Sequence, residues 1–174
     1  MSRRNPEYVD PFAGTEKGMR LQGVLPLTCC ERLAAVLADA RGEVRFQLHF
    51  VQAGSGRHRV AGKVEATVTL ECQRCLGPFA VTLESEFELA LVESEAGAER
   101  AMEQDGLEAV IVAERSLRIA DLLEDELLLA LPAVPRHAEG HAACRPLEFS
   151  RPEAVREAPK PANPFAILAD LKTH

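Results

Sequence analysis

The sequence predicts an α+β fold: a curved antiparallel sheet of about four to six strands packs against one or two helices, and a flexible C-terminal tail follows. Apolar and polar residues alternate through 44–50, 60–72 and 79–91, which is the period of strands with one buried face. Apolar residues recur at helical spacing in 116–131. Prolines and charges dominate beyond residue 135, which is typical of a flexible segment.

The first half of the chain alternates strands with one helix. The expected elements are, in order, a strand at 19–25, a helix at 29–40 capped by Thr28, a strand at 44–50, a turn at 54–56 and a strand at 60–72. The apolar positions of both long strands share one face, so each strand should lie on a single buried core.

The second half should complete the sheet and cover it. The expected elements are a strand at 79–91, an acidic loop at 93–106, a strand at 107–112 and a helix at 116–131 that ends at Pro132. Asp121 and Glu124 resemble a capping box at the start of this helix. We expect Glu124, Asp125 and Glu126 on its solvated face, because consecutive carboxylates point in different directions and rarely form a cation site.

Length and composition indicate one globular domain with tails. The 174 residues are 47% hydrophobic and 27% charged, which excludes wholesale disorder and fibrous classes. No apolar run approaches the roughly 20 residues that span a bilayer. Five cysteines, two of them adjacent at Cys29 and Cys30, suit reduced thiols better than a secreted disulfide framework. We therefore expect a cytoplasmic protein without a membrane partner.

The domain boundaries follow from these changes in pattern. We expect an N-terminal arm at 1–20, a single α+β domain at 21–135, a Pro-rich flexible linker at 136–162 and an amphipathic docking motif at 163–174. In the last segment Asn163 can cap a helix and Pro164 suits its first position. The residues expected to bind a partner there are Asn163, Pro164, Phe165, Leu168 and Leu171.

Charge is unevenly distributed along the chain. The formal net charge is −7, which argues against coating nucleic acid by bulk attraction to phosphate. Residues 84–126 hold 14 acidic residues and only three arginines, whereas the rest of the chain is net positive. This acidic region is either a solvated surface or a face that receives a basic partner, such as a ribosomal protein.

The pair Cys72 and Cys75 is the first candidate for chemistry. Two thiols at this spacing form a redox disulfide, bind a soft metal or pack at a strand end. A redox motif of the thioredoxin type precedes a helix, whose dipole lowers the thiol pKa, whereas Leu76, Gly77 and another strand follow here. The pair therefore lies at a hairpin tip, where the exposed Gln73 and Arg74 are the residues expected to recognise a partner.

A structural zinc site needs two further ligands. The other cluster of suitable residues is His137, His141 and Cys144, and His141 and Cys144 have ligand spacing. The expected set is Cys72, Cys75, His141 and Cys144, which requires the fold to bring the segment after 135 back to the strand end. The alternative is a tip whose cysteines are structural and a tail whose histidines are solvated.

Other chemistry has weaker support. No Gly-x-Ser-x-Gly, phosphate-binding glycine loop or His-Glu-x-x-His appears, so no catalytic residue is nominated and we expect neither an enzyme nor a small-molecule substrate. For direct RNA contact the candidates are Arg57, Arg59 and Lys63, joined by Arg74. The absence of Trp and a single Tyr leave little surface for base stacking.

Three segments of the chain are recognisable together: VTLECQRC at 68–75, EDELLLALPAVP at 124–135 and NPFAIL at 163–168. In this order they resemble the YceD family, the large ribosomal RNA subunit accumulation proteins. The resemblance runs from about Leu21 to the C-terminus. It implies a bacterial or organellar protein needed for synthesis, processing or stability of 23S ribosomal RNA, without assigned catalytic residues. Other branches of the family carry extra cysteines where this chain has His137, His141 and Cys144.

Three hypotheses follow. The first is a non-enzymatic ribosome biogenesis factor that binds a large-subunit precursor through a ribosomal protein, 23S ribosomal RNA or both. The second is a direct RNA-binding zinc module that uses the CxxC hairpin. The third is a thiol oxidoreductase, which requires a reactive thiolate at Cys72 or Cys75.

Overall fold

The computed structural model describes residues 6–54 and 56–145. It contains four α-helices in this range, namely α1 (Pro11–Glu16), α2 (Glu31–Val36), α3 (Glu95–Asp105) and α4 (Ile119–Leu129). The strands are β1 (Tyr8–Val9), β2 (Arg20–Pro26), β3 (Glu43–Ala53), β4 (Arg57–Glu71), β5 (Pro78–Val92), β6 (Ala109–Ile111) and β7 (Leu117–Arg118). Two short 3₁₀ turns are η1 (Leu27–Cys29) and η2 (Ala113–Arg115).

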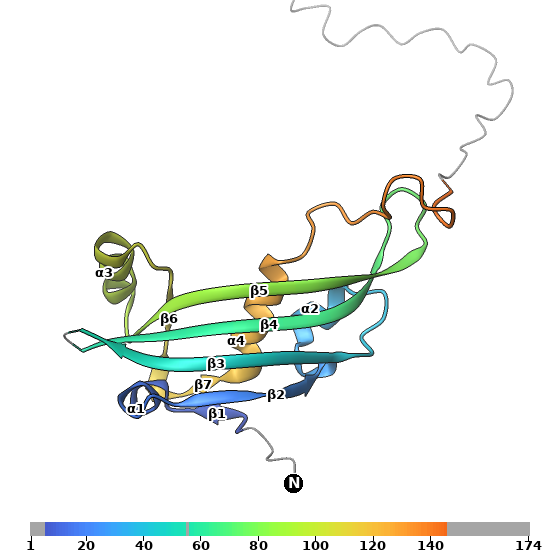
Figure 1. Ribbon diagram of the computed structural model, residues 1–174. Helices are drawn as coiled ribbons and strands as arrows, with labels where there is room; N and C mark the ends of the chain where they lie inside the picture. The colour runs from blue at the N-terminus through green and yellow to red at the C-terminus, as the bar shows by residue number, and fades with distance from the viewer. Residues whose placement is uncertain (1–5, 55, 146–174) are drawn as a thin grey trace, which may run out of the picture.

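A curved five-stranded sheet in the order β2-β3-β4-β5-β6 forms the body, and β1 pairs with β7 in a second, two-stranded sheet (Figure 1). The predicted α+β class is confirmed, and β2 to β5 pair antiparallel as expected. The edge strand β6 is the exception, because it runs parallel to β5. Helix α3 lies between these strands in the chain and returns it to the same end of the sheet, which a parallel pair requires.

One face of the sheet carries the core. Helices α2 and α4 lie against this face (Figure 1). The fully buried large side chains include Leu33 of α2, Leu123 and Leu127 of α4, and Phe50, Val60, Val64 and Val68 of the long strands. The opposite face is polar, with Arg45, Lys63 and Glu86 exposed. The period-two pattern therefore placed the long strands correctly, because each has one face in the core and the other in water.

Helix α3 (Glu95–Asp105) occupies most of 93–106, where the sequence predicted an acidic loop. Ser94 Oγ accepts a hydrogen bond from the Gly97 N–H at 3.3 Å, which caps the start of the helix. Gly106 has a φ of 64° and ends the helix in the left-handed conformation that glycine adopts without strain. The loop prediction was wrong because α3 has no apolar stripe, although both of its caps are present in the sequence.

The segment 1–20 contributes ordered structure from Tyr8 onward. Asp10 Oδ1 accepts hydrogen bonds from the N–H groups of Phe12 and Ala13, and so caps α1. The Phe12 side chain is buried in the main core. The expected docking motif at 163–174 lies outside the described residues, as does most of the expected linker at 136–162. Among the helices described, none is long and apolar enough to cross a membrane.

Candidate metal centre

The hairpin between β4 and β5 has a tight tip formed by residues 72–77. The Cys72 N–H donates to the Gly77 carbonyl at 3.0 Å, and the Leu76 N–H donates to the Cys72 carbonyl at 2.8 Å. Leu76 has a φ of 57°, a left-handed conformation that is unfavourable for a residue with a side chain. These bonds turn the chain so that Cys72 and Cys75 face the same space.

The segment after α4 returns to this tip, so that residues far apart in sequence lie side by side (Figure 1). The Gln73 N–H donates to the Pro135 carbonyl at 2.9 Å and fixes where the segment arrives. The ligand atoms of four side chains then lie within 4.8 Å of one another. We call this group the metal cluster; its members are Cys72, Cys75, His137 and Cys144.

The size of the metal cluster agrees with zinc. Tetrahedral zinc holds thiolate sulfur at about 2.3 Å and imidazole nitrogen at about 2.0–2.1 Å, which places two sulfur ligands about 3.8 Å apart and a sulfur and a nitrogen about 3.6 Å apart. The Sγ atoms of Cys72 and Cys144 are 3.8 Å apart. Cys75 Sγ and His137 Nδ1 are 3.6 Å apart. These four residues could therefore hold a metal, and both the distances and the donor types suit zinc.

The electrostatic surroundings favour a thiolate at Cys72. Burial opposes ionisation, but the backbone N–H groups of His137, Arg74 and Cys75 and the His137 side chain donate toward the sulfur, and together they lower the pKa of Cys72 to about 5. Hydrogen bonds from backbone amides to sulfur stabilise a negative charge. A ligand thiolate is thus prepared by the fold of the tip itself.

The pKa of Cys75 is raised. The Gly77 N–H stabilises its thiolate, but burial and the neighbouring sulfur atoms of Cys72 and Cys144 outweigh that hydrogen bond. Three sulfur atoms this close cannot all carry negative charge unless a cation lies between them. A divalent metal ion between the sulfur atoms would allow all three thiols to ionise.

The described structure places His137, rather than the expected His141, in the metal cluster. His137 is 9% exposed, and its ring also packs 4.9 Å from the ring of Phe79. His141 is exposed and stacks on the outer side of His137, with ring centroids 5.0 Å apart. The spacing of His141 and Cys144 favoured His141, whereas the Gln73–Pro135 hydrogen bond brings His137 to the tip, so the choice of histidine stays a prediction.

The two residues between the cysteines differ in their contacts. Arg74 Nε donates to Cys144 Sγ at 3.1 Å, so this side chain also helps to hold the returning segment. Gln73 is exposed and makes a weak bond of 3.4 Å to the Glu71 carbonyl. Leu76, at the end of the tip, is 53% exposed. The metal cluster therefore holds a small surface of Gln73, Arg74 and Leu76 at one end of the molecule.

The cations expected to contact RNA each pair with a carboxylate of this chain. The pairs are Arg57 with Asp105, Arg59 with Glu88 at 3.0 Å, and Lys63 with Glu86 at 2.9 Å. The three cations lie in the first half of β4, and RNA contact by them stays a prediction. The tail residues expected to bind a partner, 163–171, lie outside the described part of the chain.

Sequence reasoning missed the role of two acidic residues in α4. Glu124 is 3% exposed and Glu126 is 7% exposed, so the prediction of a solvated face was wrong for both. Glu124 accepts hydrogen bonds from Arg32 Nε and the Leu33 N–H, and Glu126 accepts one from Ser85 Oγ at 2.8 Å. Of Glu124, Asp125 and Glu126, only Asp125 is exposed, and it pairs with Arg32 at 2.7 Å. These contacts hold α4 to α2 and to β5.

Comparison with known proteins gives a consistent result. The family described as "Large ribosomal RNA subunit accumulation protein YceD" matches residues 60–172, which include every member of the metal cluster. A protein of Haemophilus influenzae named "Large ribosomal RNA subunit accumulation protein YceD" is 33% identical over 168 residues, which cover 96% of this chain and 95% of the relative. No solved structure matched significantly.

Proposed function

The chain belongs to the YceD family, and from this membership we propose that it is a non-enzymatic ribosome biogenesis factor. In this role it supports synthesis, processing or stability of the 23S ribosomal RNA of the large subunit. The identity with the Haemophilus influenzae relative carries the proposal, because it extends over nearly the whole length of both proteins. A protein with this task works in the cytoplasm, where ribosomes are assembled.

The metal cluster binds one structural zinc ion in this proposal. Three thiolates and one imidazole complete a tetrahedral coordination shell and leave no open position for water or substrate, which is the arrangement of structural rather than catalytic zinc sites. Zinc bound there would neutralise the adjacent sulfur atoms and fix the segment at 137–144 to the hairpin tip. The site thus supports a binding role and offers no position for catalysis.

Two surfaces of the described structure suit a large-subunit precursor. The tip presents Gln73 and Arg74 on a rigid support, and these side chains recognise the precursor in our proposal. The second surface is acidic and suits a basic ribosomal protein. Its exposed carboxylates lie on the outer face of β5 and on α3, at Glu84, Glu86, Glu88, Glu95, Glu99 and Glu103. The C-terminal motif at 163–174, joined through the linker at 136–162, docks on the same particle in this proposal.

Complementation tests this function. A Haemophilus influenzae strain without its own YceD protein receives this chain on a plasmid, and the ratio of 23S to 16S ribosomal RNA and the amount of large subunit in sucrose gradients are measured. We expect this chain to restore both quantities. A well-expressed chain that leaves both at the level of the empty plasmid contradicts the proposal.

The same strain separates the parts of the protein. Gln73→Ala with Arg74→Ala should reduce rescue, whereas Gln47→Ala, an exposed position on β3, should not. Capture of the tagged chain from lysate, with and without ribonuclease, then distinguishes its partners. Ribosomal proteins that stay bound after ribonuclease treatment support the protein partner, and their complete loss identifies RNA as the link.

A further inference from the structure

Helix α3 presents an unusual face to the rest of the protein. A helix that covers the end of a sheet normally buries an apolar stripe, but α3 turns polar and small side chains inward. The residues that share this face, at helical spacing, are Gly97, Arg100, Ala101, Gln104 and Asp105. Only Ala101 among the residues of α3 is buried. The three glutamates of α3, Glu95, Glu99 and Glu103, are exposed outside this face.

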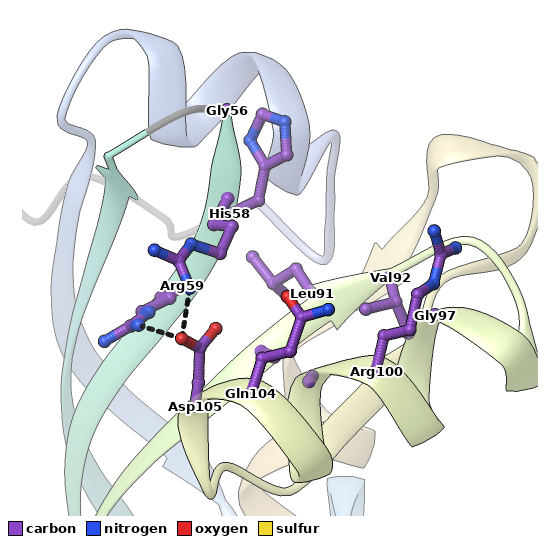
Figure 2. Close-up of a pocket in the computed structure, with 12 residues that line it drawn as sticks. Gly56, His58, Arg59, Leu91, Val92, Gly97, Arg100, Gln104 and Asp105 are labelled. Atoms are coloured by element: carbon purple, nitrogen blue, oxygen red, sulfur yellow. Dashed lines mark hydrogen bonds and ion pairs between the residues drawn. The ribbon is translucent and has the colours of Figure 1, made fainter.

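This face leaves a cavity of about 340 Å³ between α3, the start of β4 and the end of β5 (Figure 2). The volume is within the range of small-ligand sites. The floor is apolar and is formed by Ala90, Leu91, Val92 and Ala101. The rim is polar, and Figure 2 shows His58, Arg100 and Gln104 around the space. An apolar floor with a few convergent polar groups is the usual form of a ligand pocket.

The guanidinium groups of the pocket are incompletely satisfied. Asp105 pairs with both Arg57 and Arg59, the latter at 3.5 Å, and Arg59 also pairs with Glu88 at 3.0 Å, so two carboxylates face these two cations (Figure 2). Arg59 Nε is buried and has no hydrogen-bond partner among the described residues. Arg100 donates its Nε to the Ala96 carbonyl at 2.9 Å, and within the same part of the chain no carboxylate pairs with it. Within the described residues, Arg100 is therefore the cation of the pocket that no carboxylate neutralises, and Arg59 keeps one buried donor unused.

We propose that this pocket binds a nucleotide. The phosphate would lie at Arg100 and the Gln104 amide, where free donors meet a local positive charge. The base would lie on the apolar floor, against the ring of His58, since aromatic side chains and guanidinium planes stack on bases. The His58 ring also contacts the Phe12 ring, edge to face, with ring centroids 5.1 Å apart. A plain inorganic anion would make no use of this floor.

The nucleotide has two possible sources, a free mononucleotide or an unpaired nucleotide of an RNA strand. The second source rests on the proposed function, because it joins the pocket to ribosomal RNA. It also suits a chain with a net negative charge, since a single nucleotide held in a pocket requires little long-range attraction to phosphate. The pocket lies at the opposite end of the hairpin from the metal cluster, so the two sites are separate (Figure 1).

Titration of the full chain tests the proposal. AMP, GMP, CMP and UMP, an unpaired hexaribonucleotide, a duplex of the same strand, inorganic phosphate and a hexaglutamate peptide are each added up to about 5 mM. Binding is followed by calorimetry and by amide chemical shifts. We expect at least one nucleotide or the unpaired strand to bind more tightly than phosphate, duplex or peptide. The amide shifts should concentrate in β4 residues 57–59 and in α3.

Variants locate the site. Arg100→Gln should weaken the binding about tenfold or more, because it removes a charge-assisted contact. The matched control is Arg45→Gln. Arg45 is exposed on the polar face of β3, and its ion pair with Glu65 is long, at 3.8 Å. It should change the affinity less than about twofold. Urea unfolding of both variants confirms that they fold, and Gln104→Ala gives a second reading of the phosphate contact.

Several results would contradict nucleotide binding at this pocket. These are the absence of binding by every nucleotide and by the unpaired strand, equal affinity for inorganic phosphate, tighter binding of hexaglutamate, and equal weakening by Arg45→Gln. The complementation assay is independent of this experiment. If the chain restores 23S ribosomal RNA but binds no nucleotide, the proposed function is supported and the nucleotide site is contradicted. If it binds nucleotide without rescue, the nucleotide site is supported and the proposed function is contradicted.

Discussion

The carboxylate of Glu124 in α4 accepts a hydrogen bond of 2.9 Å from the backbone N–H of Leu33, in the first turn of α2. The first N–H groups of a helix lack partners within it, and the residue before α2, Cys30, makes no side-chain cap. The second carboxylate oxygen accepts from Arg32 Nε at 2.8 Å. Glu124 thus serves as the missing cap of α2, supplied from a helix 91 residues away in sequence.

We expect Glu124→Ala to lower the free energy of unfolding by about 2–3 kcal/mol, because the buried Leu33 N–H loses a charged acceptor. Urea unfolding at neutral pH measures this change. Asp125→Ala is the matched control, since Asp125 pairs with the same arginine but is exposed; its cost should be under about 1 kcal/mol. Equal losses in the two variants would show that the Arg32 ion pair, and not the cap, stabilises the contact.

The long strands could be predicted from the sequence because their periodicity depends on local alternation alone. Val60 to Cys72 alternates throughout, and the structure forms a strand from Arg57 to Glu71. Helix α3 could not be predicted in the same way, since its inward face is polar and carries no helical period of apolar residues. Its existence depends on capping by Ser94 and Gly106, which an apolar pattern does not register.

The metal cluster was only partly predictable for a similar reason. Residue type nominated Cys72, Cys75 and Cys144, and these three do converge. The choice between His137 and His141 depends on where the returning segment meets the tip, which a hydrogen bond between distant backbone groups decides. The burial of Glu124 likewise depends on Leu33, a partner in another helix. Long-range contacts of this kind leave no trace in the local sequence pattern.

The pH dependence of stability should show the burial of Glu126. Burial raises the pKa of this carboxyl above its ordinary value of 4.5, against the opposing hydrogen bond from Ser85, and Glu108 and Asp125 add to the increase. The folded state therefore holds this proton more tightly than the unfolded state does. Its contribution to stability is fully present below pH 4.5 and is lost as the pH rises through the raised folded pKa.

Glu126→Gln should accordingly become more stable relative to the unmodified chain as the pH rises from about 4 to 7, because the amide never ionises. Urea unfolding at several pH values measures the difference. Glu86→Gln provides the opposite case, since the hydrogen bond from Lys63 lowers the pKa of Glu86. Glu86→Gln should become less stable relative to the unmodified chain as the pH rises through the range in which Glu86 ionises. Parallel pH profiles for the unmodified chain and Glu126→Gln would contradict the predicted burial effect.

The two neighbouring histidines give the sharpest test of the metal centre. His137 Nδ1 lies 3.6 Å from Cys75 Sγ, whereas His141 is exposed and stacks on the His137 ring. We expect one zinc ion per chain by native mass spectrometry. Removing one of the four ligands should lower zinc affinity by about tenfold or more. Loss of a residue that only hydrogen-bonds to a ligand already has an effect of this size. Zinc content after dialysis against a chelator should therefore fall in His137→Ala and stay near that of the unmodified chain in His141→Ala.

The cysteines extend this comparison. Cys144→Ser should lose zinc as His137→Ala does, and it should also release the segment at 137–144 from the tip, because Cys144 also accepts the hydrogen bond from Arg74. Cys29→Ser, which removes a free thiol outside the cluster, controls for the general effect of removing a sulfur atom.

Amide exchange in residues 72–77 and 137–144 should accelerate on chelation in the unmodified chain, since the metal would bind the two segments together. Retention of zinc by His137→Ala and its loss from His141→Ala would assign the fourth ligand to His141 and show that the returning segment is seated differently.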